Sequence, residues 1–419
     1  MNPILPRNYF VPDVEAHVMP DGRLYLYGSL DISGEKDYCS KQLRCFSTDD
    51  MLSWRDEGII FCNDGEQSQF KAHPDVPLYA PDAIHKNGKY YLFVCCPGGF
   101  EGVAVADSPC GPFREAVSIK GADGDGIDPA IFVDDDGTAY YFWGQFHLKG
   151  GILTEDMTAL RPESIRDNIL TEHEHGFHEG ASIRKRNGKY YLVYTDISRG
   201  RATCMSYAMS DSPLGPYTKC GVIIDNYGCD PQSWNNHGSI ECFKGQWYVF
   251  YHRSSQNSNT SRRVCVEPIF FDENGLIYEV QQTCHGVEKP LDATRKIDAS
   301  IASKMSKDCY IVPVEQGEVV VCQGQNYAQS WIEYRMLDFD DGVSELVLHI
   351  KGKGIVSVKC ENKLFGCTKF QCDDFISITL TIQFLSGIHT FWVLLNGEEI
   401  VLDSFYFNRS EKLLHKDYI

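Results

Sequence analysis

Hydrophobic and aromatic residues gather in short runs that follow glycine-containing turns along the first two thirds of the chain. In the clearest example, residues 181–184 enter a hairpin, Asn187-Gly188 forms its turn and residues 190–194 return as an aromatic run. Asn-Gly tolerates the positive φ of a tight turn, and aromatic and β-branched residues favour strands. The pattern therefore predicts a β-hairpin, with Glu179 just before its first strand.

The same turn and aromatic strand occur five times, with turn glycines at positions 22, 88, 137, 188 and 245. Repeats of about 40–60 residues that contain several short strands are typical of a β-propeller, with one blade in each repeat. Helix signals are weak throughout, because Gly and Pro interrupt the sequence often. We therefore predict an all-β protein whose residues 1–290 form a five-bladed β-propeller.

The repeat stops near residue 290, and the polar stretch 291–307 is interpreted as a linker. Residues 308–419 contain further short strands, which we expect at 317–322, 331–337, 345–350, 355–359, 376–382 and 390–395. Short strands about 10 residues apart favour a β-sandwich. The second domain is thus predicted to be a small C-terminal β-sandwich.

Charge and hydropathy narrow the range of partners. The net charge of −19 argues against nucleic acid and anionic membranes, because binding to phosphate needs clustered Lys and Arg. No apolar run approaches the length of about 18 residues that spans a membrane. The first residues show neither a basic nor an apolar leader, so we expect a cytoplasmic protein. The 17 cysteines are then expected to be free thiols. They include no C-x2-C pair, so we expect no zinc site. Nothing in the sequence predicts the oligomeric state.

Acidic residues recur near the start of the first strand of four of the five repeats. They are Asp13 with Glu15, Asp82, Asp128 and Glu179, and His237 takes the equivalent place in the fifth repeat. A single Asp at such a place usually caps a turn. Several carboxylates in one channel raise the pKa of one group while another stays ionised, which is what glycoside hydrolysis needs. The recurrence therefore favours a catalytic interpretation.

An ordered set of motifs over residues 1–290 resembles glycoside hydrolase family 43. The set is N-P-I-L-P at 2–6, Pro12-Asp13, Ile127-Asp128-Pro129, Glu179-Gly180-Ala181, His237-Gly238-Ser239 and Tyr251-His252-Arg253. The resemblance implies a five-bladed propeller of a family in which many members are α-L-arabinofuranosidases, β-D-xylosidases or arabinanases that act by inversion. It implies that Asp13 is the general base, Asp128 the modulator of pKa and Glu179 the general acid. Because Val14 and not Pro follows Asp13, Glu15 stays open as an alternative base on the same strand face.

The resemblance also implies residues around the substrate. His252 matches a histidine that often lies beside a bound calcium ion, although a buried structural histidine is an equal alternative. Arg263 is expected to point at the sugar and Arg262 to face outward. Asp82 and His237 are expected to bind sugar hydroxyls. Trp143 and Phe100 are candidates for sugar stacking or for the core.

The last segments, at 334–339, 386–392 and 403–407, are similar to family 6 carbohydrate-binding modules. Sugar binding by this domain stays open at this point.

These observations predict an inverting exo-glycosidase that releases a terminal pentose, arabinofuranose or xylose, from short oligosaccharides. It requires no cofactor, and a structural calcium in the propeller channel is compatible with the sequence. The alternatives are another exo-glycosidase specificity such as galactosidase, a retaining propeller hydrolase, a phosphorylase and a non-catalytic sugar-binding propeller. A phosphorylase would need basic residues for phosphate, and the motifs offer only Arg253, Arg262 and Arg263.

Overall fold

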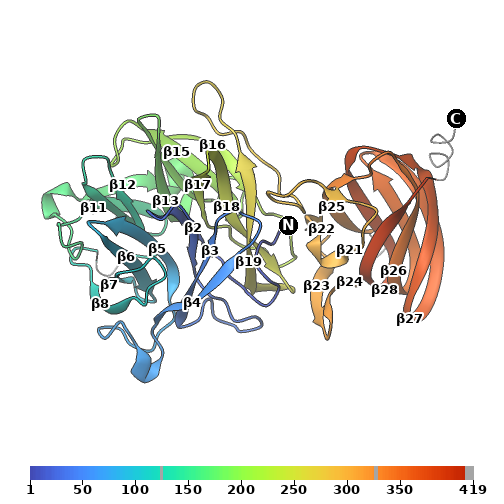
Figure 1. Ribbon diagram of the computed structural model, residues 1–419, viewed down its shortest axis with the longest axis horizontal. Helices are drawn as coiled ribbons and strands as arrows, with labels where there is room; N and C mark the ends of the chain where they lie inside the picture. The colour runs from blue at the N-terminus through green and yellow to red at the C-terminus, as the bar shows by residue number, and fades with distance from the viewer. Residues whose placement is uncertain (123–125, 325–328, 411–419) are drawn as a thin grey trace.

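The computed structural model describes residues 1–122, 126–324 and 329–410. It contains two β parts, one formed by strands β1 to β19 and the other by β20 to β28, and the N-terminus lies near their junction (Figure 1). The first part is a five-bladed propeller, so the predicted all-β fold is confirmed. Within the described ranges, no helix is long and apolar enough to cross a membrane.

Each blade is an antiparallel sheet of consecutive strands. The first comprises β1 (Glu15–Val18), β2 (Leu24–Gly28), β3 (Gln42–Thr48) and β4 (Arg55–Cys62). The second comprises β5 (Tyr79–Lys86), β6 (Lys89–Cys96), β7 (Phe100–Ala106) and β8 (Arg114–Ser118). The third comprises β9 (Ala130–Val133), β10 (Ala139–Trp143), β11 (His147–Ile152) and β12 (Arg166–Thr171).

The fourth blade comprises β13 (Phe177–Arg186), β14 (Lys189–Asp196), β15 (Cys204–Ser210) and β16 (Thr218–Asp225). The fifth has β17 (Ser239–Phe243), β18 (Gln246–Ser255) and β19 (Ser258–Ile269). One short helix, α1 (Glu172–His175), leads into β13, and 3-10 turns lie at Gly65–Gln67, Pro162–Ser164 and Ala299–Ile301. The predicted hairpin is confirmed as β13–β14, whose turn residues Asn187 and Gly188 have φ of 51° and 76°.

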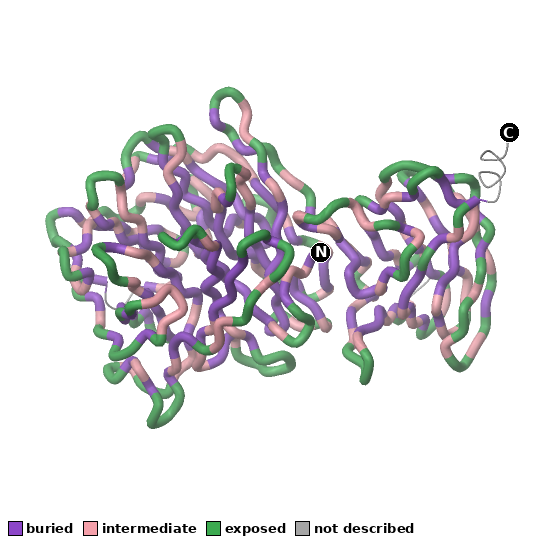
Figure 2. Tube along the Cα trace, viewed as in Figure 1, coloured by how far each residue is buried: buried purple, intermediate pink, exposed green. Residues whose placement is uncertain are grey.

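The first strands of the blades surround the axis of the propeller. β1 contacts β5 and β17, β5 contacts β9, β9 contacts β13, and β13 contacts β17, which closes the ring. A buried hydrophobic cluster lies between each pair of neighbouring blades, and Figure 2 shows these inner segments as buried. Apolar residues packed from both sides hold the blades together through the hydrophobic effect. The polar groups that precede the first strands are thereby fixed around one axis.

The start of the chain joins the last blade. Val266 N–H of β19 donates to Asn2 Oδ1 at 3.0 Å, and Ile4 N–H donates to the Val264 carbonyl at 3.1 Å. Asn2 Nδ2 also donates to Glu267 at 2.9 Å. These bonds satisfy backbone groups on the edge of the three-stranded fifth sheet, which would otherwise lack partners. The first blade and the fifth blade are thus tied together by the N-terminal segment.

The C-terminal strands form one hydrogen-bonded sheet around a single hydrophobic cluster. Its strands are β20 (Leu291–Asp292), β21 (Ile297–Asp298), β22 (Lys304–Met305), β23 (Cys309–Val314), β24 (Gly317–Cys322), β25 (Ser330–Asp338), β26 (Val343–Cys360), β27 (Lys363–Leu385) and β28 (Ile388–Arg409). The two strands expected at 345–350 and 355–359 are one continuous strand, β26. Gly352, with φ of 113°, lies at a shift of register within β26 and is not a turn.

Residues 291–307, predicted as a linker, supply the short strands β20, β21 and β22 to this sheet. Cys309 and Cys322 form a disulfide between β23 and β24, so the expectation of free thiols is wrong for this pair, while the other 15 cysteines are free. The exact domain limits and the similarity of this part to family 6 modules stay predictions.

The two parts of the chain meet through buried polar contacts. Arg263 of β19 forms a bidentate ion pair with Glu318 of β24, with Nη2–Oε1 and Nη1–Oε2 distances of 2.6 and 3.0 Å. Met305 N–H donates to the Gly228 carbonyl at 2.7 Å. Arg and carboxylate planes match in such a bidentate geometry, which fixes orientation as well as contact. The C-terminal part therefore packs against the side of the propeller that carries blades four and five.

Candidate active site

A cavity of about 270 Å³ opens at one end of the propeller axis. It is lined by Asp13, Tyr38, Cys39, Tyr79, Ile127, Asp128, Gln145, His178, Glu179, Trp234, Asn235, His237 and Arg262. Four of the predicted site residues are thus brought together from four blades: Asp13, Asp128, Glu179 and His237. Five others, Asp82, Arg263, Trp143, Phe100 and His252, are not among the lining residues.

The backbone at the carboxylates departs from regular strand geometry. Asp13 and Asp128 have φ of 56° and 59°, in the left-handed region that non-glycine residues seldom adopt. Gly180, directly after Glu179, has φ of 68°, and a side chain there would meet the His237 ring at 2.8 Å. Such strained positions persist only where the surroundings fix them, and they concentrate at functional sites. Each kink turns a carboxylate residue away from its strand and toward the cavity.

Asp13 is held as an anion. Its Oδ1 accepts a hydrogen bond from Arg262 Nη1 at 2.9 Å, and its Oδ2 accepts one from Ser29 Oγ at 2.9 Å. Burial would raise the pKa of Asp13, but the charge of Arg262, followed by His237 and His252, outweighs burial and lowers the pKa below its ordinary value. Asp13 is therefore ionised under conditions in which an ordinary buried carboxyl would hold a proton.

Asp128 has the opposite tendency. Burial, then the charge of Glu179 and then that of Asp13, raise the pKa of Asp128 well above its ordinary value, although the Gly180 N–H partly counteracts them. The pKa values of Asp128 and Asp13 therefore shift in opposite directions, so Asp128 holds a proton at a pH at which Asp13 has lost its own.

Glu179 is more exposed than Asp128. Its Oε2 accepts a hydrogen bond from Gln145 Nε2 at 2.9 Å, and its Oε1 lies 3.4 Å from Asn235 Nδ2. His237 Nδ1 lies 3.7 Å from Asp13 Oδ1 and 4.0 Å from Asp128 Oδ2. Burial lowers the pKa of His237 more than the neighbouring carboxylates raise it, so the imidazole is neutral near pH 7. A neutral imidazole can donate or accept a hydrogen bond with a sugar hydroxyl.

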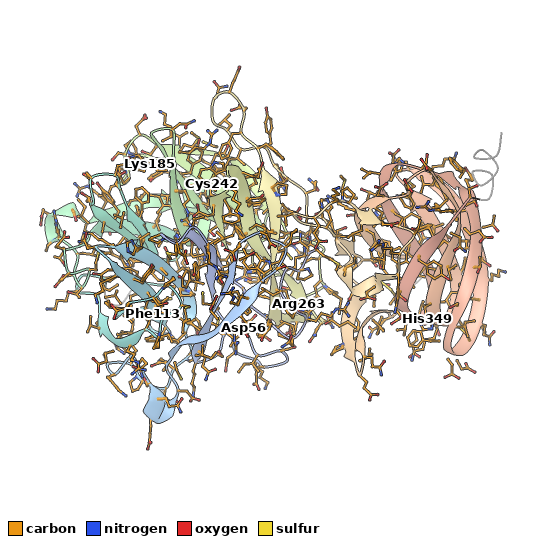
Figure 3. The ribbon with its side chains drawn as sticks, viewed as in Figure 1. Asp56, Phe113, Lys185, Cys242, Arg263 and His349 are labelled. Atoms are coloured by element: carbon orange, nitrogen blue, oxygen red, sulfur yellow. A yellow bond between two sulfur atoms is a disulfide. The ribbon has the colours of Figure 1, made fainter. Side chains whose placement is uncertain are left out.

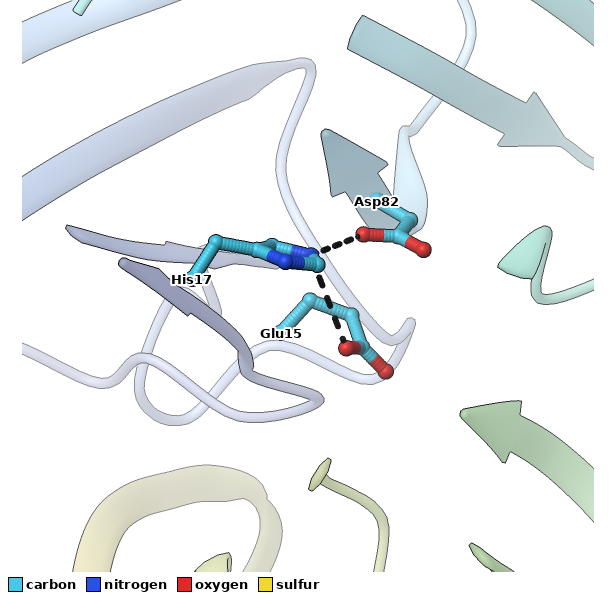
Figure 4. A group of neighbouring side chains, drawn as sticks. All are labelled: Glu15, His17 and Asp82. Carbon is cyan, nitrogen blue, oxygen red and sulfur yellow. Dashed lines mark hydrogen bonds and ion pairs between the residues drawn. The ribbon is translucent and has the colours of Figure 1, made fainter. Parts of the chain in front are cut away.

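Glu15, the alternative base, belongs to another group. Figure 4 shows it with His17 and Asp82, whose potential ligand atoms all lie within 4.8 Å of one another. Asp13 precedes β1 with a left-handed φ, so the alternation of strand faces does not extend to it, and the prediction that both acids share a face is wrong. Of the two, Asp13 lines the cavity.

The predicted sugar contact of Asp82 needs correction, because Asp82 is 1% exposed and joins inner strands. Its Oδ1 lies 2.6 Å from His17 Nε2 of β1, and its Oδ2 accepts from Ile131 N–H of β9 at 2.7 Å. These partners use both of its oxygens. Asp82 therefore links three blades around the axis.

The buried group of Glu15, His17 and Asp82 could hold an ion, because Glu15 Oε1 has no hydrogen-bond partner. Its fit to calcium is poor, because calcium takes 6–8 oxygen ligands and most oxygens here are engaged. Glu15 Oε2 already accepts from Ser182 Oγ at 3.1 Å and from Arg184 Nη2 at 3.2 Å. The guanidinium of Arg184 also places a positive charge where a calcium ion would need a negative one.

His252 was the predicted neighbour of a metal and does not belong to this group. Its Nδ1 lies 3.5 Å from Asp13 Oδ1, and its Nε2 lies 3.0 Å from the Asn235 carbonyl. Burial, aided by Arg262, lowers the pKa of His252 to about 3. His252 is therefore a neutral, fully buried support beneath Asp13, which corrects the metal assignment.

The structure exchanges the predicted roles of two arginines. Arg262 lines the cavity, where it contacts Asp13 and forms a double hydrogen bond with Asp31 at 2.9 Å for each bond. Arg263 points to the C-terminal part, near whose boundary Figure 3 labels it. Neighbouring residues on a strand face opposite sides, so only one of the two arginines can face the cavity. The register of β18 and β19, in which Arg262 pairs with Ser254 and Arg263 with Arg253, decides that this is Arg262.

The two aromatic residues predicted to stack on sugar lie elsewhere. Trp143 is 2% exposed and belongs to the cluster between blades two and three, with its ring 5.7 Å from that of Tyr141. Phe100 is 37% exposed but stacks on His73, with ring centroids 3.8 Å apart. Both are corrected to structural positions outside the cavity lining.

Sequence reasoning missed the aromatic rim of the cavity. Trp234 is 56% exposed, and Tyr38 and Tyr79 also line the cavity. Gln145 and Asn235, which contact Glu179, were missed as well. Trp234 and Asn235 lie three and two residues before the recognised His237, which is the one sequence signal that could have found them.

Arg262 should control the pH dependence of the reaction through Asp13. Because Arg262 lowers the pKa of Asp13, we expect Arg262→Gln to raise that pKa and move the acid limb of kcat/KM to higher pH by about 1–3 units. A smaller shift is expected for Arg262→Lys, which keeps the charge. The measurement is a pH profile of kcat/KM. Arg263→Gln is the matched control, and an unchanged limb in Arg262→Gln would contradict the assignment.

Comparison with known proteins agrees with this geometry. Residues 1–277 match the model of glycosyl hydrolases family 43. A xylosidase/arabinosidase of Thermoclostridium stercorarium is 31% identical over 349 residues, which cover 73% of this chain and 72% of the relative. The chain therefore belongs to glycoside hydrolase family 43 and is a glycoside hydrolase.

Two solved structures are similar in fold. One is a family 43 β-xylosidase/α-arabinofuranosidase from a compost microbial metagenome, in complex with xylotriose and in a calcium-free form. It is 30% identical with a TM-score of 0.58, covering 67% of this chain and 97% of its own. The other, an arabinoxylan arabinofuranohydrolase from Bacillus subtilis, is 23% identical with a TM-score of 0.58. Because it covers 98% of this chain and 97% of its own, its fold similarity extends over both parts.

Proposed function

We propose that the enzyme is an inverting exo-glycosidase that removes a terminal pentose, arabinofuranose or xylose, from short oligosaccharides. The observation that carries this proposal is the convergence of Asp13, Asp128 and Glu179 on one cavity, in which the pKa of Asp13 is lowered and that of Asp128 is raised. Glycoside hydrolysis needs an ionised carboxylate and a protonated carboxyl group on the two sides of the scissile bond. The xylosidase/arabinosidase activities of the relatives support the choice of pentose.

In the proposed mechanism, Asp13 takes a proton from a water molecule that attacks the anomeric carbon. Glu179 donates its proton to the glycosidic oxygen, so that the bond between this oxygen and the anomeric carbon breaks as the bond to water forms. Glu179 is assigned this role because its carboxyl group is more exposed to the cavity, whereas Asp128 is 8% exposed. Asp128, whose pKa the charge of Glu179 helps to raise, is assigned the role of modulator beside the acid. The carboxyl groups supply every proton transfer, so no cofactor takes part.

The size of the cavity supports release of a terminal sugar. Pockets for drug-sized ligands measure about 300–1,000 Å³, and this cavity of about 270 Å³ is suited to a single sugar ring. Trp234 and Tyr38 at the rim offer apolar faces to the ring and its neighbour. A chain would therefore enter by its end.

The proposal is tested by hydrolysis of p-nitrophenyl α-L-arabinofuranoside, p-nitrophenyl β-D-xyloside and xylobiose, with the first-formed xylose followed by proton NMR. We expect turnover without added phosphate and α-xylose as the initial product of the β-linked substrate, since water attacks from the face opposite the leaving group. Initial β-xylose would indicate retention and contradict the role of Asp13. Turnover that requires phosphate would indicate a phosphorylase.

A further inference from the structure

A second cavity, of about 370 Å³, lies where the propeller meets the C-terminal part. We call it the interface cavity; its lining residues are Arg201, Tyr227, Gly228, Asp230, Pro231, Lys304, Met305, Ser306, Lys307 and Trp331. The first five belong to the fourth blade and the loop after it, and the others belong to β22, β25 and the segment between them. Figure 1 shows β22 and β25 at the boundary that faces the propeller. Both parts of the chain are needed to form this cavity.

Three cations, Arg201, Lys304 and Lys307, converge on the interface cavity in a protein whose net charge is −19. Within the described part of the chain, none of them has a carboxylate oxygen within the 4.0 Å of an ion pair. By contrast, the buried Arg262 and Arg263 each form an ion pair. Unpaired cations around one concave site attract an anionic group.

The surroundings of the cations leave this positive charge uncompensated. Burial, and then the charge of Arg335, lower the pKa of Lys304 from its ordinary value. The carboxylate in the lining, Asp230, accepts backbone N–H groups from Gln232 at 2.9 Å and from Asn257 at 3.0 Å. Its oxygens are therefore engaged by backbone groups of the chain itself.

Aromatic side chains accompany the cations. Arg201 lies over the Tyr227 ring at 4.7 Å, which holds the guanidinium at the wall of the cavity. Trp331 is partly exposed and also lines a neighbouring cavity of about 410 Å³, whose other residues include Asn257, Tyr310 and Gln323. An indole that lines both cavities offers an apolar face to a sugar ring, with hydrogen-bonding groups on either side.

The same loop lines both the interface cavity and the active-site cavity. Tyr227 and Pro231 belong to the former, and Trp234 and Asn235 to the latter. Pro231 and Trp234 are three residues apart, so their Cα atoms are at most about 11 Å from each other. The loop is also fixed to the site, because Asn226 Nδ2 donates to the His252 carbonyl at 2.7 Å. A ligand in the interface cavity therefore lies near the mouth of the active site.

We propose that the interface cavity is a second binding site for an acidic oligosaccharide, in which Arg201, Lys304 and Lys307 bind a uronic acid carboxylate and Trp331 packs on a sugar ring. The choice of a sugar ligand rests on the proposed glycosidase function. The site adds affinity for chains that carry an acidic substituent and leaves the chemistry at Glu179 unchanged.

The test is calorimetric titration with two ligands of four sugar units each, xylotetraose and xylotriose that bears one glucuronic acid. The Glu179→Gln background prevents turnover of either ligand. We expect the acidic ligand to bind at least about 10-fold more tightly, since charge-assisted hydrogen bonds are the strong ones. The double variant Arg201→Gln/Lys307→Gln should lose this preference, and Trp331→Ala should weaken the binding of both ligands. Lys307→Gln alone alters an exposed residue and tests the site without risk to the fold.

Lys369→Gln, which removes an exposed lysine of β27, is the matched control and should keep the preference. In the otherwise wild-type enzyme, the double variant should hydrolyse small p-nitrophenyl glycosides normally. Equal affinity for the acidic and neutral ligands, or a preference that survives the double variant, would overturn the proposal. If free glucuronate or phosphate bound as tightly as the acidic oligosaccharide, the claim that the site recognises a sugar chain would be overturned. If the wild-type enzyme hydrolysed none of the test glycosides, only the proposed function would be refuted, because binding is measured without turnover.

Discussion

Replacement of Glu179 by Gln should lower the hydrolysis of xylobiose or an arabino-oligosaccharide at least about 10²-fold, because the substitution removes the proposed general acid. The loss should be much smaller with a p-nitrophenyl glycoside. Nitrophenolate is a stable leaving group that departs without a proton, whereas a sugar alkoxide does not. The measurement is kcat/KM of wild type and variant on both classes of substrate.

Glu174→Gln is the matched control for this prediction, because Glu174 is an exposed acid of α1 only five residues earlier. It should retain activity on both substrates. An equal loss on the two classes in Glu179→Gln would show that Glu179 does not protonate the leaving group. Full activity on xylobiose would remove it from the mechanism.

Replacement of Asp13 by Asn should lower kcat/KM at least about 10²-fold on both classes of substrate, because activation of the attacking water is needed whatever the leaving group. This common loss distinguishes the general base from the general acid. Asn has nearly the same shape, so Ser29 and Arg262 still surround it, but the negative charge that Arg262 neutralises is absent. The measurement is the same pair of assays, with circular dichroism to establish that the variant is folded.

Asp211→Asn serves as the control, because it removes an acid that is 83% exposed and forms an ion pair with Lys189 at the surface. Addition of azide gives a second readout. A small anion can replace the missing base as a nucleophile, so it should restore turnover of the p-nitrophenyl substrate in Asp13→Asn but not in Glu179→Gln. An Asp13→Asn variant that loses activity on xylobiose alone would contradict the assignment.

The sequence predicted the propeller well because its repeat is local. Each hairpin depends on a turn such as Asn187-Gly188 and on the aromatic strand that follows it, and both signals lie within a few residues. The C-terminal part was predicted less closely. Gly352 and Gly354 lie within β26, where Gly352 stands at a shift of register, and sequence alone does not distinguish such glycines from turn glycines.

The carboxylates Asp13, Asp128 and Glu179 could be found from the sequence for a related reason. Each stands at or next to the first strand of its repeat, and a propeller brings equivalent positions together around its axis. The prediction for Asp82 followed the same logic and failed, whereas Trp143 and Phe100, for which sugar stacking and the core were both open, lie outside the cavity lining. Asp82 lies deeper along the axis, and the two aromatic side chains pack within or beside blade two.

By itself, the sequence determined the all-β class, the number of blades and the residues able to supply acid and base, because these depend on local turns and on a repeat along the chain. Only the tertiary structure decided that Arg262 and not Arg263 supports Asp13, and that Asp13 and not Glu15 lines the cavity. The physical reason is that inward orientation depends on strand register and on single left-handed residues. The unequal pKa values of the carboxyl groups likewise arise from burial and from charges on other blades, far apart in the sequence.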